Sequence, residues 1–186
     1  MMKTFDKRLT LEEVNLLKSF VGKCMTLYSH DEFIYSSSSS QAIEIVVENV
    51  PYYLYSFVES EDYFGTTEDV AAWTFTEEKL PIIESKTFVK TPVNDIIQKI
   101  TMIQENQRLY ENGKQTYDVW VTRGIVFDFG DRQIAFEKDV WFSEEIIVHR
   151  GYNLIECFSS VDGFGENWDK SVKAECTRTC EIIEND

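Results

Sequence analysis

Hydrophobic residues near the N-terminus recur at the spacing of an amphipathic helix. They stand three or four positions apart, at Leu11, Val14, Leu17 and Val21. Thr10 and Glu13 have the spacing of a capping box, in which each side chain binds the backbone N–H of the other residue. Gly22 is a natural stop, because glycine readily adopts the left-handed conformation that ends helices. These positions predict a helix over about residues 10–21.

From residue 23 to about residue 89, hydrophobic and polar positions alternate, which is typical of half-buried strands. Segments 43–47 and 53–57 are separated by Asn49-Val50-Pro51, and this pattern predicts a hairpin. Segments 70–75 and 82–89 predict two further strands. The run of five serines at 36–40 has no apolar side chain to bury and predicts a loop.

A second stripe at helical spacing follows, at Val93, Ile96, Ile97, Ile100 and Ile103. Thr91 is a candidate N-cap, and Pro92 would occupy the first helical position, where its missing N–H costs nothing. The stripe predicts a second helix over about residues 92–105. Asn112-Gly113 then predicts a turn.

The C-terminal part alternates regularly again. Residues 117–129, the turn Gly130-Asp131 and residues 134–136 predict a hairpin. Segments 146–148 and 152–158 predict further strands, and Trp168 is expected to anchor a short final helix. The predicted fold class is therefore α+β, with mainly antiparallel sheets built from hairpins and two principal helices. We expect one compact domain over residues 1–186, with two lobes dividing near 90–115 as the alternative.

Composition adds a large core and a strong negative charge. Hydrophobic residues make up 43% of the chain and aromatic residues 14%, which excludes a disordered acidic tail. The 33 acidic side chains outnumber the 18 basic ones, for a formal net charge of -15 at pH 7. Such a field repels nucleic acid and anionic membranes and attracts basic protein surfaces. We therefore expect a basic protein partner, with no direct binding to nucleic acid or membrane.

The cysteines and the N-terminal residues indicate a compartment. Residues 1–8 are polar, and no apolar run approaches the length of a membrane span. We expect a cytoplasmic protein whose four cysteines are free thiols. Cys157, Cys176 and Cys180 with His149 could bind zinc, but their spacing is a loose match to structural zinc sites. We predict no metal and no cofactor.

Catalytic motifs are weak. Asp128-Phe129-Gly130 matches a kinase triplet, but the other kinase motifs are missing, so Phe129 is interpreted as a core residue and Gly130 as a turn. His30 and His149 are the two histidines, and there is no Gly-x-Ser-x-Gly segment. We therefore predict that the protein is not an enzyme. The alternative is a metal-dependent hydrolase that uses paired carboxylates.

The acidic pairs are better interpreted as a contact surface for a basic protein. Carboxylates two residues apart on a strand point the same way, about 6.6 Å apart, which approximates the spacing of phosphates along nucleic acid. Aromatic side chains beside them suit contacts with arginine. The predicted partner-binding residues are Tyr55, Glu59, Glu61, Asp62, Tyr63, Glu68, Asp69, Glu137, Asp139, Glu144 and Glu145. The alternative is a solvated surface with no such partner.

A compact, acidic chain without catalytic motifs resembles the small inhibitor proteins of bacteriophages and mobile elements. These include anti-CRISPR proteins and other nucleic-acid mimics. The resemblance covers size, charge and the missing chemistry, and it implies inhibition by binding, for example in the basic channel of a Cas nuclease. The alternative is an immunity protein that neutralises a cognate toxin, which would also use an acidic surface against a basic one.

Overall fold

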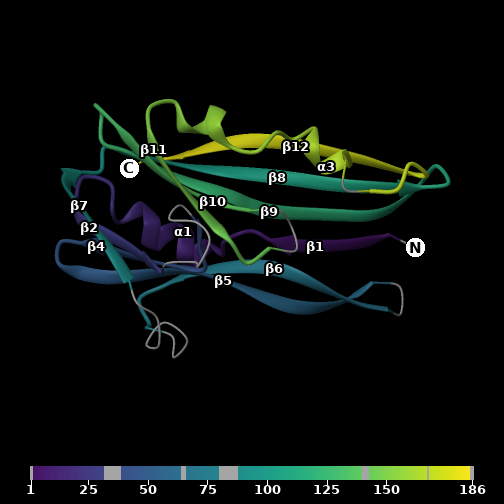
Figure 1. The fold of residues 1–186 in the computed structure, drawn as a ribbon, viewed down its shortest axis with the longest axis horizontal. Coiled ribbons are helices and arrows are strands. Elements are labelled where there is room, and N and C mark those ends of the chain that lie inside the picture. The colour runs from purple at the N-terminus through teal and green to yellow at the C-terminus, as the bar shows by residue number, and fades with distance from the viewer. Residues whose placement is uncertain are drawn as a thin grey trace.

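The computed structural model describes residues 2–31, 39–63, 66–79, 88–139, 143–166 and 168–184. Its strands form two sheets that pack against each other (Figure 1). Seven strand residues are described by their backbone only, namely Asp31, Ser39, Ser40, Tyr63, Thr66, Glu68 and Asp69. The fold is mainly β, and all the helices among the described residues are short.

The larger sheet contains the C-terminal half of the chain. Its strands follow the order β12 (Val172–Ile183), β8 (Lys99–Glu111), β9 (Lys114–Asp128), β10 (Gln133–Lys138), β11 (Ile146–Gly151) and β3 (Ser39–Ser40). All these neighbours are antiparallel. Strand β1 (Lys3–Lys7) joins the sheet separately, by parallel pairing with β9. The N-terminus therefore enters a sheet that is otherwise formed mostly by residues after Lys99.

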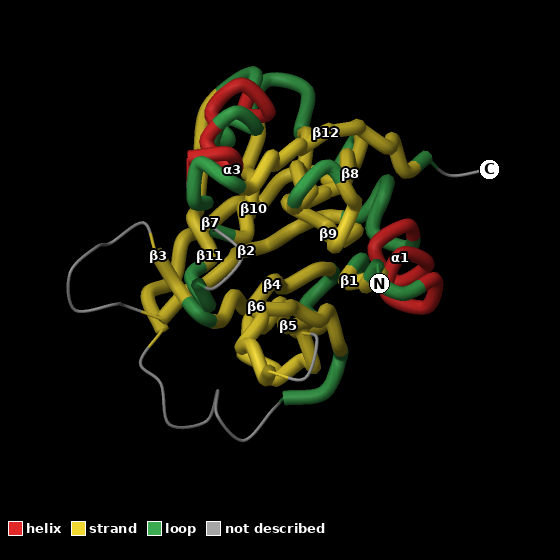
Figure 2. Tube along the Cα trace, turned by 90° about the vertical axis from the view of Figure 1, so that its right-hand side faces the viewer, coloured by secondary structure: helices red, strands yellow, loops and turns green. Residues whose placement is uncertain are grey.

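The smaller sheet is antiparallel throughout. Its order is β6 (Thr66–Thr76), β5 (Val50–Tyr63), β4 (Ala42–Val47), β2 (Cys24–Asp31) and β7 (Phe88–Ile96). Three short helical segments complete the described chain: α1 (Leu11–Lys18), the 3₁₀ turn η1 (Leu154–Cys157) and α3 (Gly163–Glu166). Figure 2 shows α1 and α3 on opposite sides of the larger sheet.

The first predicted helix is confirmed, although it is shorter than predicted. Helix α1 ends at Lys18 instead of residue 21. Both halves of the predicted capping box are present, since the Thr10 side chain accepts from the N–H of Glu13 and the Glu13 carboxylate accepts from the N–H of Thr10. This local pairing satisfies two N–H groups that a helix start would otherwise leave unbonded.

The second predicted helix, over residues 92–105, is wrong. The segment contains the end of β7, a break at Ile97 and Gln98, and the start of β8. Ile100 belongs to the core between the sheets, whereas Ile103 packs in a separate cluster with Phe158. The apolar stripe therefore does not form one face, and its isoleucines follow the strand preference of β-branched side chains. Pro92 is tolerated because β7 is an edge strand.

The predicted hairpins are confirmed, with small shifts. Strands β4 and β5 are joined at Glu48 and Asn49, both with positive φ, one residue before the predicted turn. Asn112 and Gly113 form the predicted turn, between β8 and β9. Strands β9 and β10 form the C-terminal hairpin, in which Phe129 is buried as predicted.

Other predictions fail or lie partly outside the described residues. The predicted strand 152–158 is wrong, because it contains η1. Ser39 and Ser40 of the predicted serine loop pair with β11, whereas 36–38 are outside the described residues. The same holds for most of the predicted strand 82–89, of which Phe88 begins β7. The predicted short helix near Trp168 is α3, whose Phe164 packs edge-on against that indole.

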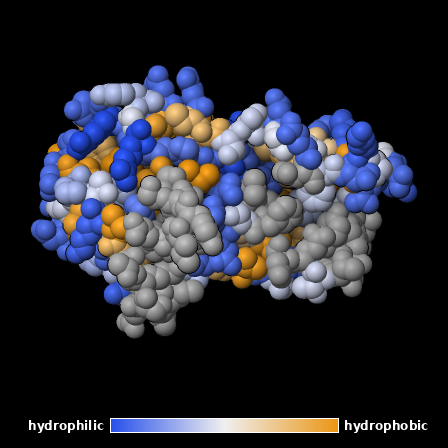
Figure 3. Space-filling view, viewed as in Figure 1, coloured by the Kyte–Doolittle hydropathy of each residue, from blue (hydrophilic) through white to orange (hydrophobic). Residues whose placement is uncertain are grey.

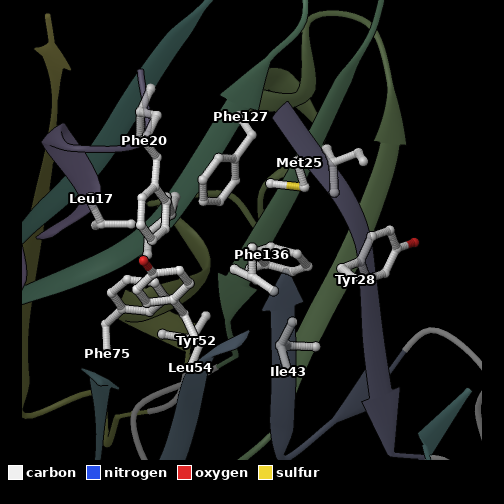
Figure 4. Packing of buried hydrophobic residues seen from close by; sticks show 14 of the residues in the cluster. Leu17, Phe20, Met25, Tyr28, Ile43, Tyr52, Leu54, Phe75, Phe127 and Phe136 are labelled. Atoms are coloured by element: carbon white, nitrogen blue, oxygen red, sulfur yellow. The ribbon is translucent and has the colours of Figure 1, made fainter. Parts of the chain in front are cut away.

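The core lies between the two sheets and beneath α1. Its largest cluster draws Leu17 and Phe20 from the helical region, Phe75 from the smaller sheet and Phe127 and Phe136 from the larger one (Figure 4). The chain crosses from one sheet to the other between β7 and β8, inside the interval 90–115. This shared cluster joins the two sheets through buried aromatic and aliphatic contacts.

Gly124 provides a test of packing on the face of the larger sheet that is covered by Phe158. A Cβ there would lie 2.1 Å from Cε2 of Phe158, which is itself buried. We expect Gly124→Ala to lower the free energy of unfolding by about 1–3 kcal/mol, because the ring has to move. In a Phe158→Ala background the same substitution should cost much less, as measured by thermal denaturation of both single variants and the double variant. An equal cost in both backgrounds would contradict this packing.

Candidate partner-binding groove

An open groove runs between α1 and β6, which is one of the two edge strands of the smaller sheet. The groove has a volume of about 940 Å³, and the end of β1 closes one side of it. Its lining residues are Asp6, Lys7, Arg8, Thr10, Glu12, Glu13, Asn15, Leu16, Ser19, Phe57, Glu59, Ala72, Trp73, Thr74, Phe75, Thr76, Glu77 and Glu78. We call this the α1–β6 groove.

The α1–β6 groove is strongly acidic. Six of its lining side chains are carboxylates and two are cations, which gives a formal charge of -4 from 2 − 6. The half-buried Phe57 of β5 also lines it, whereas the side chains of Trp73 and Phe75 belong to the core between the sheets. Hydrophilic residues also cover much of the molecular face shown in Figure 3, with smaller hydrophobic patches between them. The same charges produce a stronger electrostatic potential in a concave site than on a flat surface, because the low-dielectric walls focus the field.

Two of the groove carboxylates are structural. Glu13 accepts hydrogen bonds from Thr74 Oγ1 at 2.6 Å and from the Phe75 N–H at 2.8 Å. Burial raises the pKa of Glu13, but these hydrogen bonds and those from Thr10 outweigh it and hold the pKa below its usual value. Asp6 is paired with Arg8 at 2.6 Å. Glu13 therefore ties the start of α1 to the edge of β6.

Three other carboxylates of the groove are available to a partner. Glu12, Glu77 and Glu78 are exposed, and their carboxylates have no hydrogen bond or ion pair with the residues that the structure describes. Glu12 lies in the first turn of α1, and Glu77 and Glu78 directly follow β6. None of the three was predicted from sequence, because no local motif brings Glu12 close to the end of β6.

The predicted acidic ladder on β5 is already paired within the chain. Glu59 and Glu61 both bind the ammonium of Lys7, which confirms that these carboxylates point the same way. Asp62 is 2.7 Å from the Nζ of Lys3. Burial lowers the pKa of Lys7, but the two glutamates outweigh it and raise the pKa overall. Strand β1 thus provides the cations that we expected from a partner.

The remaining predicted residues near β5 are dispersed. Tyr55 is half-buried and stacks on Phe57, with ring centroids 5.9 Å apart. Burial, and then the charge of Glu144, raises the pKa of Tyr55. Glu144 accepts a hydrogen bond from Gln41, and Glu145 is half-buried before β11. The side chains of Tyr63, Glu68 and Asp69 are outside the described part of the chain.

Glu137 was predicted on the contact surface, but it is buried. Only 1% of it is exposed, and it is bonded to Arg123 Nη2 at 3.0 Å, His149 Nε2 at 2.7 Å and the Ser159 N–H at 2.9 Å. Burial raises the pKa of Glu137, but His149 and Arg123 outweigh it and lower the pKa overall. The neighbouring Asp139 accepts a hydrogen bond from Arg123 through its backbone carbonyl, at 2.8 Å. Glu137 therefore stabilises the fold and does not face a partner.

A second buried carboxylate, Glu105, belongs to the same network. It accepts from Arg178 Nη2 at 2.6 Å and Nε at 3.0 Å, and from the Cys176 thiol at 3.6 Å. Burial, and then the charge of Glu105, raises the pKa of Cys176 to about 12. A raised pKa disfavours the thiolate form of Cys176, which is the nucleophilic form of a thiol. Sequence analysis missed β12, because its alternating pattern contains few apolar residues.

The described residues show no metal-binding cluster, disulfide or membrane-spanning helix. The described residues contain no group of three or more histidine, cysteine or acidic side chains placed to hold a metal ion. All four cysteines are free thiols. Cys176 and Cys180 lie on strand β12, so their Cα atoms are about 13 Å apart along it, too far for one tetrahedral zinc. None of the described helices has the length and apolar character of a membrane span.

The pairing of Lys7 predicts the effect of charge reversal on β5. We expect Glu59→Lys with Glu61→Lys to lower the free energy of unfolding by about 1–3 kcal/mol, because Lys7 loses both partners and meets like charge. The measurement is thermal denaturation. Asp131→Lys with Glu156→Lys makes the same charge change at exposed acids, and this control should melt close to the wild type. Equal melting of the two variants would contradict a structural role for the pair.

The lowered pKa of Glu137 predicts an acid dependence of stability. Between its folded pKa and the ordinary value of 4.5, the unfolded chain binds more protons than the folded protein. The contribution of Glu137 is therefore complete above pH 4.5 and is lost as the pH falls through the folded pKa. Glu137→Gln should cost about 3–5 kcal/mol near pH 7 and flatten the acid limb of a denaturant titration. Glu166→Gln is the exposed control, and an unchanged acid limb in Glu137→Gln would contradict the assignment.

Comparisons of the chain with protein-family models, curated proteins and solved structures found no match. The features that bear on function are therefore the charge of the α1–β6 groove and its three carboxylates without a partner among the described residues.

Proposed function

We propose that the protein is a non-enzymatic acidic inhibitor, whose α1–β6 groove binds the basic nucleic-acid-binding surface of a partner such as a Cas nuclease. The observation that carries this proposal is a concave acidic groove lined by Glu12, Glu77 and Glu78, three carboxylates that have no hydrogen bond or ion pair with the described residues. We assign the contact surface to this groove instead of the acids of β5, because those acids are already paired with lysines of β1.

The groove suits arginine and lysine side chains of a folded partner. Its volume of about 940 Å³ admits several such side chains, and carboxylates on opposite walls can bind them from two sides. Arginine is favoured, because its guanidinium pairs with carboxylates and can also stack on an aromatic ring such as that of Phe57. A partner surface that binds nucleic-acid phosphates has the same side chains at high density.

Inhibition follows from competition for that surface. A protein with a net charge of -15 is attracted to a basic channel over several ångströms beyond contact. Once its carboxylates occupy the arginine and lysine side chains, the channel can no longer hold its nucleic acid. The complex should weaken as salt rises, because the Debye length is about 10 Å at 0.1 M salt and shorter above it.

A triple charge reversal tests the groove. We expect Glu12→Lys, Glu77→Lys and Glu78→Lys together to abolish inhibition while leaving the fold intact, because exposed charges contribute little to stability. The assay measures target-DNA binding by a panel of purified Cas nucleases, at low and high salt. Binding of a fluorescent nona-arginine peptide provides a second readout that does not depend on the choice of nuclease.

The matched control has the same net charge. Asp131→Lys, Glu156→Lys and Glu166→Lys reverse three exposed acids outside the groove, so both triple variants carry -9, from -15 + 6. The control should keep most of the inhibition and peptide binding. Equal loss in both variants would show that only total charge matters, and inhibition retained by the groove variant would place the contact surface elsewhere.

A further inference from the structure

Strand β12 forms one edge of the larger sheet. It pairs with β8 on one side, and no strand among the described residues pairs with its other side (Figure 1). All twelve of its residues are in register with β8, without a bulge. The unpaired side of such a strand offers a row of backbone N–H and C=O groups to another strand.

Strand β12 lacks the features that protect two other edge strands of this fold. Strand β7 contains Pro92, whose missing N–H interrupts pairing, and β3 has only two residues. Strand β12 contains neither proline nor glycine. Its charged side chains also balance, since two cations and two carboxylates give 2 − 2 = 0, in a chain with a net charge of -15. The general negative charge of the chain is therefore not repeated along this edge.

The two ends of β12 differ in exposure. Residues 179–182 are all exposed, and 55% of Ile182 is accessible to solvent. At the other end of the strand, Val172 is half-buried and packs in a cluster with Phe164 and Trp168. An antiparallel partner with the same sequence would bring the exposed end of one copy beside the half-buried end of the other.

Symmetry limits how a second copy can pair with this edge. In an antiparallel pair with a two-fold axis, residues on the same face lie opposite each other, and one residue lies opposite its own copy. If that residue is Thr177, Lys173 lies opposite Glu181 of the second copy at both ends of the interface. The same register places Ile182 opposite Val172. Opposite charges, two threonines and two aliphatic side chains are all favourable cross-strand pairs.

Registers shifted to either side lose these pairs. An axis at Glu175 or Arg178 places like charges opposite each other. An axis at Cys176 or Thr179 places every charged side chain of β12 opposite a neutral one. Thr177 also lies near the middle of β12, so residues 172–182 of both copies can pair. Charge and length therefore favour the same register.

Both partners in the Lys173–Glu181 pair are accessible. The Lys173 side chain is 72% exposed, and its Nζ lies 2.7 Å from Glu175 of its own strand. Glu181 is exposed and accepts a long hydrogen bond, at 3.5 Å, from Gln104. Lys173 would thus lie between two carboxylates, one from each copy. Salt screens repulsion between distant acids of the two copies more than these close contacts, since the Debye length is about 8 Å at 0.15 M.

We propose that β12 is the interface of a homodimer, in which two copies join their larger sheets by antiparallel pairing of β12 about a two-fold axis at Thr177. The partner is a second copy of this chain, selected by the Lys173–Glu181 pairs and by the contact of Ile182 with Val172. No residue of β12 lines the α1–β6 groove, so the dimer does not depend on the function proposed for that groove.

Charge reversal at the edge tests the interface and its register. We expect the wild type to show a monomer–dimer equilibrium in sedimentation experiments at concentrations up to about 1 mM. Lys173→Glu and Glu181→Lys each place like charges opposite each other twice, and each should weaken dimerisation about tenfold or more. Mixed in equal amounts, the two variants should form a heterodimer with close to wild-type affinity, because opposite charges again face each other at both ends.

The mixture also controls for net charge. The two variants carry -17 and -13, which sum to -30, the same as two wild-type chains. Lys23→Glu makes the charge change of Lys173→Glu at an exposed lysine outside β12 and should dimerise nearly as well as the wild type. A wild type that stays monomeric, equal dimerisation of Lys173→Glu and Lys23→Glu, or a mixture that fails to regain the dimer would each overturn the proposal.

A disulfide across the axis provides a second measurement. Residues directly opposite each other in an antiparallel pair have Cα atoms about 4.5–5.5 Å apart, within the range of a disulfide. In a background with Cys157→Ser and Cys180→Ser, Thr177→Cys should therefore form a cross-linked dimer on mild oxidation. The background itself should not, because its Cys176 would lie opposite Arg178. No cross-link through position 177, or an equal one in the background through Cys176, would contradict this register.

Discussion

The parallel pairing of β1 with β9 is the constraint on which the rest of the structure depends. Strand β9 spans Lys114–Asp128, and it can accept β1 along its first half only because β10 pairs with its second half. The pairing brings Lys3 and Lys7 against β5 and so connects the two sheets through ion pairs. It also fixes where α1 begins. The position of the α1–β6 groove follows from this single non-local contact.

The net charge of -15 is therefore not distributed as a uniform surface. Acids that lie within reach of a lysine or arginine of the chain become structural, as Glu59, Glu61 and Glu137 do. The acids left over determine where a basic partner can bind. Buried pairs are costly to form, since both charges lose their hydration, but they are more costly to break. The positions of the lysine and arginine side chains in the fold therefore determine which carboxylates remain available to a basic partner.

Local features of this fold could be predicted from sequence, whereas pairings between distant residues could not. The capping box of α1 and the turns at 112–113 and 130–131 depend on neighbouring residues and were predicted correctly. The segment 92–105 was misinterpreted, because a strand break at Ile97 and Gln98 imitates helical spacing. The same limit applies to the candidate site. The common direction of Glu59 and Glu61 follows from strand geometry, but their pairing with Lys7 depends on β1.

The backbone on one side of the acidic groove is held in place before a basic partner binds. Helix α1 is held to β6 by the hydrogen bonds of Glu13, so the backbone of its neighbour Glu12 is fixed beside the groove that Glu77 and Glu78 also line. Each arginine or lysine that enters the groove can pair with a carboxylate whose backbone position the fold has already set. Because this part of the groove is formed before binding, little backbone entropy is lost there on association, and the main ordering cost is that of the exposed glutamate side chains. The binding energy of a basic partner then comes from charges that folding has already placed.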